Sequence, residues 1–415
     1  MVIDTNTMEL RDHQKKITQL MTTETKGKIL VPTGGGKTMI MIQHAIKHFE
    51  ESTVPQTIVV VAPRILLAQQ LCTEFTSLID ADVLHVHSGK NEYKNTTDPK
   101  VIQEWVDNNT NNILIFTTYH SLHKVCVLDD VDIVYYDEAH NSTTKSFFPA
   151  VQEFSQREQT KDYYFTATPK YGTRSNFIGM NIPSIYGEII ENVTASELID
   201  NGSIIPPTIV PFNVNGTRTR QNAHEFDVDA TLDLLDEIDD NELTPKVVVS
   251  IGSSKVLQSM LGRTPLLQEL KDRGYDVLHV TSKFGAYVND KKVSRSQFMT
   301  TLNEWGTDDD KKFIVFHYSI LSEGISVSGL THSIMLRQLN LIEMAQTIGR
   351  VIRMDARDKA DISSNKLKSG QVQFYRKSTG YVCVPMSSKA TVARLQRVVD
   401  DIFVKGIPPL PLSYK

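Results

Sequence analysis

The chain has 415 residues, of which 40% are hydrophobic and 22% charged, and 44 Lys and Arg against 49 Asp and Glu give a formal net charge of −5. This composition is typical of globular proteins, excludes disorder as the main state, and argues against nonspecific coating of nucleic acid. Because no run of about 18 apolar residues could span a membrane and the polar start lacks a signal peptide, we expect a soluble, cytoplasmic protein without membrane partners.

Cysteine usage fits a reducing compartment. Cys72, Cys126 and Cys383 lie far apart and form no CxxC pair. Neither a disulfide framework nor a cysteine zinc site is therefore expected.

The first half of the chain contains short, nearly continuous apolar runs that alternate with amphipathic segments of helix length. The runs occupy residues 28–31, 57–63, 113–118, 132–140 and 163–169. Continuous hydrophobicity indicates strands buried on both faces, as in a parallel sheet that helices cover on each side. The pattern predicts a doubly wound α/β domain.

A second set of apolar runs predicts the same architecture again. These runs occupy residues 246–253, 275–282, 312–319 and 331–337. Before them lies an acidic stretch, 225–242, with nine carboxylates and no Lys or Arg. Leu232, Leu235 and Ile238 recur at helical spacing, which indicates a solvated helix with one buried stripe. We predict domains at 1–205 and 246–415, joined by a linker at 206–245.

A glycine-rich turn follows the first predicted strand. The segment VPTGGGKT, residues 31–38, lets Gly34, Gly35 and Gly36 bring backbone amides close to a triphosphate, at the amino end of the next helix. Lys37 would reach the β- and γ-phosphates, and the Thr38 hydroxyl would bind Mg²⁺. Val31 replaces the first glycine of the usual phosphate-loop pattern. A glycine turn without a ligand is the alternative.

Two carboxylates end a later strand. Asp137 and Glu138 follow the apolar run of DIVYYDEAH, at the edge where ligands collect in open parallel sheets. Asp137 suits Mg²⁺, and Glu138 could orient and deprotonate an attacking water. His140 could link this site to neighbouring motifs by hydrogen bonds. We do not expect it to be a metal ligand, because no second His or Cys stands at metal-ligand spacing on the same element.

A second group of catalytic candidates lies in QTIGRVIR, residues 346–353. Gln346, Arg350 and Arg353 recur at helical spacing and share one helix face. Arginines from another domain can compensate charge on a transferring phosphoryl group. A solvated helix face is the alternative.

The order of these motifs resembles that of the superfamily 2 helicases and translocases, in their DEAH-type branch. VPTGGGKT, DEAH and QTIGRVIR resemble motifs I, II and VI of that family. The chain looks most similar to the group of type I and III restriction translocase subunits and phage branch-migration helicases. The resemblance implies two tandem RecA-like domains, each a mostly parallel sheet covered by helices on both faces, with ATP and Mg²⁺ as cofactors and nucleic acid as the partner. It also makes a phage or viral origin one alternative.

The resemblance implies roles for further residues. ATP binding would involve Arg11 and Gln14 of LRDHQ, Thr33 of the phosphate loop and Gly324 of LSEGISV. Nucleic acid would contact Arg64 of APRILLAQQ, and Thr117 and Thr118 of TTYHSL. Coupling between the ATP site and the nucleic-acid contacts would involve His140, Thr166, Thr168 and Glu323. Ser322 and Ile325 depart from the usual small-residue pattern of motif V.

The function that follows is an ATP-dependent DNA helicase or translocase that unwinds, remodels or moves along DNA. DNA is favoured over RNA, and an RNA helicase, a restriction translocase subunit and a nucleic-acid-binding module with a decayed ATPase remain alternatives. The retained Lys37, Glu138 and arginines weigh against decay. Oligomeric state stays open, with a monomer as one possibility.

Overall fold

The computed structural model describes residues 10–89, 92–172, 177–281, 283–318, 327, 329–337, 339–385 and 389–401. They form two compact units, and the boundary falls between Val193 and Thr194. Across these residues, helices are too short or too polar to cross a lipid bilayer.

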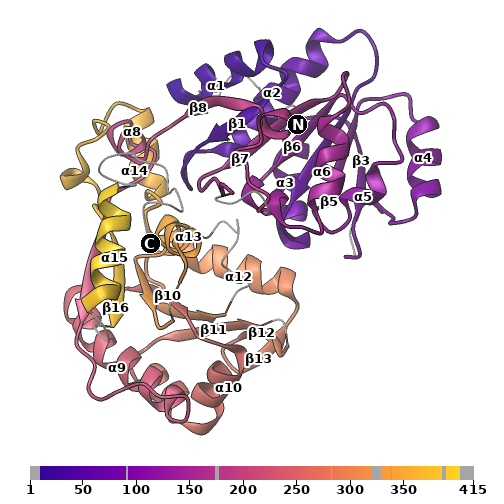
Figure 1. The fold of residues 1–415 in the computed structure, drawn as a ribbon. Coiled ribbons are helices and arrows are strands. Elements are labelled where there is room, and N and C mark those ends of the chain that lie inside the picture. Colours follow the sequence, from indigo (N-terminus) through magenta and orange to yellow (C-terminus); the bar gives the residue numbers. More distant parts are fainter. Residues whose placement is uncertain are drawn as a thin grey trace. The chain divides into compact units, whose positions relative to one another are not determined.

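The first unit is built on an eight-stranded sheet in the order β4-β3-β5-β2-β6-β7-β1-β8, in which every pair is parallel (Figure 1). Its strands are β1 (Lys26–Leu30), β2 (Thr57–Ala62), β3 (Asp82–Val86), β4 (Lys94–Asn95), β5 (Ile113–Thr118), β6 (Ile133–Tyr136), β7 (Lys161–Thr166) and β8 (Glu188–Asn192). Its helices are α1 (Asp12–Thr23), α2 (Lys37–Glu51), α3 (Ile65–Thr76), α4 (Pro99–Asp107), α5 (Leu122–Val125), η2 (Ala139–Thr143), α6 (Phe148–Ser155) and α7 (Pro183–Tyr186).

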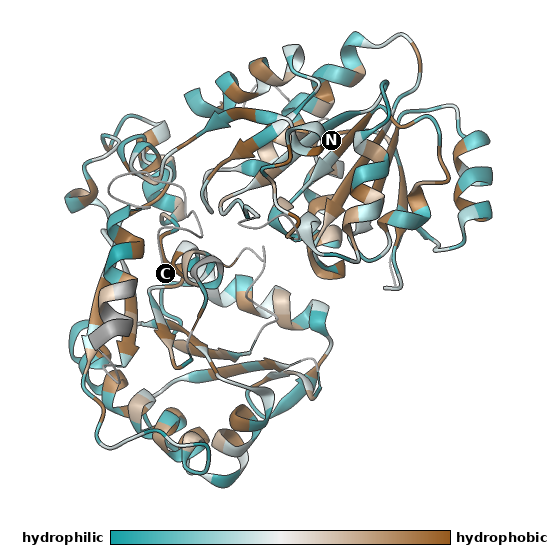
Figure 2. Cartoon of the chain, viewed as in Figure 1, coloured by the Kyte–Doolittle hydropathy of each residue, from teal (hydrophilic) through white to brown (hydrophobic). Residues whose placement is uncertain are grey.

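The apolar runs form the centre of this sheet. Every residue of β2 and β5 is buried, and Figure 2 shows the strands as mainly hydrophobic, whereas outer helices such as α4 carry hydrophilic residues. The parallel register pairs Val61 with both Thr117 and Tyr136. The carboxyl ends of β2, β5 and β6 therefore meet at one edge, where the loops that follow them carry the candidate site residues.

The second unit has a sheet in the order β13-β12-β11-β14-β10-β15-β16-β9, parallel except for the β11-β12-β13 meander. Its strands are β9 (Pro207–Phe212), β10 (Lys246–Ser250), β11 (Asp276–Thr281), β12 (Gly285–Val288), β13 (Lys291–Val293), β14 (Phe313–His317), β15 (His332–Met335) and β16 (Gly380–Pro385). Its helices are α8 (Ala195–Asp200), α9 (Ala223–Asn241), α10 (Ser254–Arg263), α11 (Leu266–Asp272), α12 (Arg295–Thr307), α13 (Leu341–Val351), α14 (Ala356–Ser363), η3 (Val372–Phe374) and α15 (Lys389–Val399). The α/β class with two mostly parallel sheets is confirmed.

Residues 206–245 differ from the expected linker. β9 pairs with β16 as the edge strand of the second sheet, a position that tolerates Pro207 and Pro211 because an edge strand needs fewer backbone donors. α9 packs on the same core through Leu235 and Ile238, and Leu232 is partly buried, which confirms the amphipathic helix within the acidic stretch. The segment is thus an integral part of the second unit.

Candidate nucleotide-binding site

The phosphate loop joins β1 to α2, which begins at Lys37. Gly34 and Gly36 have φ values of 90° and 80°, in the left-handed region that favours glycine. The amide of Gly35 donates to the carbonyl of Pro32 at 3.0 Å, which closes the turn. The sequence therefore folds here as a tight glycine turn at a helix amino end, the geometry that binds phosphate.

Helix α1 holds this loop from the side. Nε2 of His13 donates to the carbonyl of Gly35 at 2.8 Å, and Nε2 of Gln14 donates to that of Gly36 at 3.4 Å. Oε1 of Gln14 in turn accepts from the amide of Arg11 at 3.0 Å. The structure thus brings Gln14 to the phosphate loop, and Arg11 is linked to Gln14 through its backbone amide. Burial lowers the pKa of Arg11. His13 was missed by sequence reasoning, although it lies within LRDHQ.

Lys37 connects the loop to the carboxylates. Its Nζ lies 3.7 Å from Oε1 of Glu138 and donates to the carbonyl of Val31 at 3.5 Å. Only 11% of the Lys37 side chain and 5% of the Glu138 side chain are exposed, so this ion pair is shielded from water. Thr33 and Thr38 are half-buried at the two ends of the turn.

Asp137 and Glu138 directly follow β6. The main chain of Asp137 is fixed, because its amide donates to the carbonyl of Val61 and its carbonyl accepts from the Tyr119 hydroxyl, each at 2.9 Å. Glu138 has a φ of 45°, a left-handed conformation that costs a non-glycine residue about 1–3 kcal/mol. Such strain is common at functional sites. The Glu138 carboxylate lies beside Lys37 of the phosphate loop.

The charge balance of this pair suits a divalent cation. Burial and the neighbouring Glu138 carboxylate raise the pKa of Asp137, and Lys37 opposes the rise. A cation would relieve the same desolvated negative charge. Asp137 and the Thr38 hydroxyl supply the oxygen ligands that Mg²⁺ prefers, and Mg²⁺ commonly takes only one or two protein ligands beside phosphates and water. The residues therefore fit Mg²⁺.

His140 joins the DEAH segment to the end of β7. The side-chain amide of Asn141 donates to Nε2 of His140 at 3.3 Å, which assigns the proton of the neutral ring to Nδ1. Nδ1 lies 3.1 Å from Oγ1 of Thr166 and 3.5 Å from Oγ1 of Thr168. It is also 3.6 Å from Oε2 of Glu138. A continuous polar path therefore runs from Glu138 to the FTATP segment.

The residues expected to contact nucleic acid differ in their exposure to solvent. Arg64 is exposed and directly precedes α3, and its side chain makes no capping hydrogen bond to that helix. Thr117 and Thr118 are buried in β5, and the Thr117 hydroxyl donates to the carbonyl of Val86 at 2.8 Å. The neighbouring strand therefore engages the Thr117 side chain, and the contact of Thr117 with nucleic acid stays a prediction.

The arginine candidates lie on and after α13. Gln346 and Arg350 are buried in that helix, and Arg353 is half-buried just beyond its end. Nε2 of Gln346 has no hydrogen-bond partner among the described residues, so this buried donor remains available. Glu323 and Gly324 fall outside the described residues.

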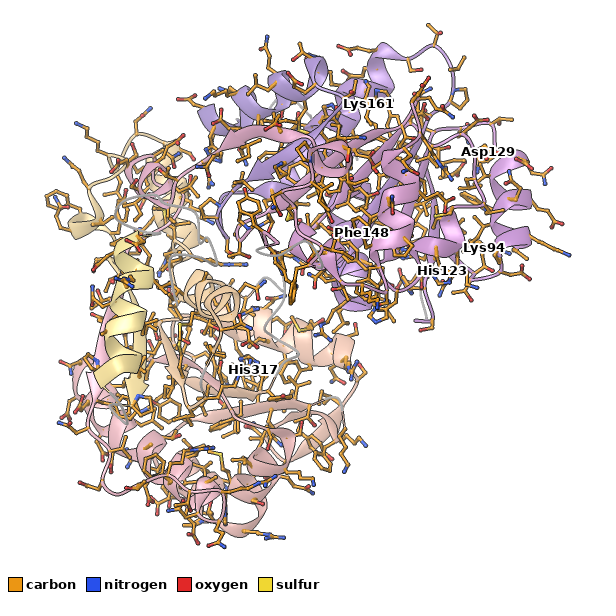
Figure 3. The ribbon with its side chains drawn as sticks, viewed as in Figure 1. Lys94, His123, Asp129, Phe148, Lys161 and His317 are labelled. Atoms are coloured by element: carbon orange, nitrogen blue, oxygen red, sulfur yellow. The ribbon has the colours of Figure 1, made fainter. Side chains whose placement is uncertain are left out.

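A histidine missed by sequence reasoning lies at the end of β14, in the interior of the second unit (Figure 3). Nε2 of His317 is 3.2 Å from Oγ of Ser250. Burial lowers the pKa of His317 and the positive charges of Arg350 and Arg337 lower it further. The ring is therefore neutral and adds no positive charge beside Arg350.

Comparisons with known proteins relate the amino-terminal segment to one family. Residues 7–171 match the family described as "Type III restriction enzyme, res subunit". No curated protein sequence matches the chain.

Three solved structures share the fold over nearly the whole chain. The ATP-dependent Type ISP restriction-modification enzyme LlaBIII bound to DNA is 16% identical with a TM-score of 0.68, over 95% of this chain and 30% of that one. A nuclease-deletion mutant of the Type ISP enzyme LlaGI with a DNA substrate mimic is 17% identical with a TM-score of 0.60, over 95% and 29%. A fragment described as an HsdR subunit of a type I restriction enzyme from Vibrio vulnificus YJ016 is 17% identical with a TM-score of 0.61, over 96% and 66%.

The chain thus spans about 30% of the length of the two Type ISP enzymes. At these identities the structural likeness shows a shared fold, whereas the family match covers the segment that carries the phosphate loop and the DEAH box. Residues 7–171 are therefore similar to the family described as "Type III restriction enzyme, res subunit", in agreement with the resemblance that the motifs of this segment carry.

Proposed function

We propose that the chain is an ATP-driven DNA translocase, the motor part of a restriction system, which couples ATP hydrolysis to movement along DNA or to its remodelling. The observation that carries the proposal is the shielded Lys37–Glu138 contact of 3.7 Å beside a left-handed glycine turn. Two structures with the same fold are DNA-bound restriction enzymes, which supports DNA over RNA as the partner.

In the proposed reaction, the amides of Gly34 and Gly36 and the Lys37 ammonium bind the β- and γ-phosphates, and Thr38 and Asp137 would hold Mg²⁺. The metal supplies charge neutralisation when bound. Glu138 orients a water molecule and accepts its proton while the water oxygen bonds to the γ-phosphorus and the bond to the ADP oxygen breaks.

The proposal also gives a role to the residues of QTIGRVIR. Arg350 and Arg353 offset the charge that develops on the transferring phosphoryl group. Nε2 of Gln346, which lacks a hydrogen-bond partner within the described part of the chain, is suited to a phosphate oxygen or the attacking water. On DNA, contacts to the phosphate backbone through Arg64 would be independent of sequence and weaken with salt.

The path through His140 supplies the coupling step of the proposal. Loss of the γ-phosphate changes the environment of Glu138, and His140 can pass this change to Thr166 and Thr168 through contacts of 3.1 and 3.5 Å. The segment after β7 would then respond to the state of the nucleotide.

The test compares ATP hydrolysis by the full chain with duplex DNA, branched DNA and RNA. We expect stimulation by DNA, no hydrolysis by Lys37→Ala, and a fall in kcat of about 10²- to 10⁴-fold with retained ATP binding in Glu138→Gln, because only the proton transfer is lost. Glu158→Gln is the matched control, since Glu158 is exposed.

Each other outcome points to a different function. Stimulation by RNA alone would favour an RNA helicase. A wild-type rate equal to that of Glu138→Gln under every condition would favour a nucleic-acid-binding module with a decayed ATPase.

A further inference from the structure

Lys377 joins three segments of the second unit at a single atom. It lies between η3 and β16, and its Nζ donates to the backbone carbonyls of Leu330 at 2.6 Å, Val351 at 2.6 Å and Arg353 at 3.0 Å. An ammonium group carries three protons, so each has an acceptor. The segment before β15, the end of α13 and the segment before β16 are thereby tied together.

The carboxyl end of α13 is held at three successive carbonyls. Lys377 binds those of Val351 and Arg353, and the amide of Ile205 donates to the carbonyl of Ile352 at 2.9 Å. The last carbonyls of a helix have no partner within the helix, and a cation at this end interacts favourably with the helix dipole. The backbone from which the Arg353 side chain extends is therefore fixed from two directions.

This arrangement is costly, which argues against a role in packing alone. Burial and, after it, the positive charge of Arg353 lower the pKa of Lys377 to about 7, and the negative charges of Asp355 and Glu242 oppose this shift. An apolar side chain could fill the same space without desolvating a charge. Two of the three hydrogen bonds that the ammonium donates go to carbonyls at the end of α13, the helix that carries Arg350.

We propose that Lys377 is a positioning residue for Arg350 and Arg353. By tying the end of α13 to the segment that contains Leu330, three residues beyond LSEGISV in the sequence, it sets where the two guanidinium groups lie during hydrolysis. The proposal rests on the proposed function, because it requires these arginines to act on ATP.

Two variants of the full chain test it. Lys377→Met keeps the length of the side chain and removes the ammonium, and Lys377→Arg keeps a positive charge with several donors. Lys366→Met is the matched control, because 74% of the Lys366 side chain is exposed. The measurements are DNA-stimulated ATP hydrolysis, the melting temperature, and amide hydrogen exchange in peptides that cover residues 344–353.

We expect Lys377→Met to lower kcat about 10- to 100-fold with the KM for ATP within about twofold, because misplaced arginines weaken the transition state more than substrate binding. Exchange in residues 344–353 should rise about tenfold, since the helix end loses two bonds. Lys377→Arg should recover part of kcat, and Lys366→Met should match the wild type.

Several results would overturn the proposal. An unchanged kcat in Lys377→Met would do so, as would a lowered kcat with unchanged exchange in residues 344–353. If Lys377→Met does not fold, a folded Lys377→Arg with wild-type exchange and a kcat below about 1% of wild type would also refute it. Failure of the proposed function can be distinguished from failure of the positioning role alone. If the proposed function is wrong, the wild type itself hydrolyses no ATP, and Lys377 then has no positioning role in hydrolysis.

Discussion

Asp162 is a buried carboxyl group in the core of the first unit, and its replacement by Asn should remove a pH dependence of stability. It is 0% exposed on β7, next to Lys161, which Figure 3 labels. Burial raises its pKa from 3.8 to about 7, and Lys26 and the Tyr136 hydroxyl oppose the rise. The folded chain therefore retains this proton over a pH range in which the unfolded chain has lost it, so stability falls as the pH rises through that range.

The size of the effect follows from the two pKa values. One pKa unit corresponds to about 1.4 kcal/mol, so the shift from 3.8 to about 7 makes the ionised group cost about 4 kcal/mol. Between about pH 5 and about pH 8, wild type should lose about 3 kcal/mol through this group alone. An amide does not ionise. The free energy of unfolding of Asp162→Asn should therefore gain about 3 kcal/mol relative to wild type over the same interval.

The chain offers a convenient probe for this measurement. It has two tryptophans, Trp105 on α4 of the first unit and Trp305 on α12 of the second. In a Trp305→Phe background, the fluorescence of Trp105 reports urea unfolding of the first unit alone. We would compare Asp162→Asn with its parent at both pH values. An equal stability difference at the two pH values would refute the assignment of a raised pKa to Asp162.

Two further predictions concern the site. Gly36→Ala should weaken binding of an ATP analogue at least about tenfold in calorimetry and destabilise the first unit by about 1–3 kcal/mol. The reason is that the φ of Gly36 is +80° and a Cβ there would lie 2.3 Å from Nε2 of Gln14. Unaltered affinity would show that the turn tolerates a side chain. Thr166→Val should leave the rate of ATP hydrolysis without DNA within about threefold of wild type but remove most of the stimulation by DNA. The reason is that this change breaks the 3.1 Å contact with His140. Full stimulation by DNA in this variant would exclude the path through His140 from coupling.

Some site residues could be predicted because their chemistry is local in sequence. A glycine turn between a strand and a helix, and carboxylates after an apolar run, each follow from neighbouring residues, and the structure places Lys37 and Glu138 in contact. His13 could not be found in this way, because its bond to Gly35 spans 22 positions. Thr117 differs from these residues. The resemblance implies that it contacts nucleic acid, whereas the structure shows its hydroxyl bonded to a carbonyl of the adjacent strand.

The fold shows the same division. Long apolar runs were enough to predict the central strands, such as 57–63 and 113–118, because burial on both faces demands continuous hydrophobicity. The edge strands β4, β8, β9 and β13 were missed, because they are short, polar or interrupted by proline. The inner strands β3, β12 and β16 were not predicted either. Their conformation depends on pairing with a strand already in place.

The amino-acid sequence by itself determined the α/β class, the glycine turn and the identity of the carboxylates, since each depends on residues within one element and its flanks. Tertiary structure alone decided that α1 supports the phosphate loop, that residues 206–245 belong to the second unit, and that Lys377 caps the arginine helix. Those features depend on hydrogen bonds between segments distant in the chain, and hydrophobic periodicity carries no information about which distant partners such bonds will join.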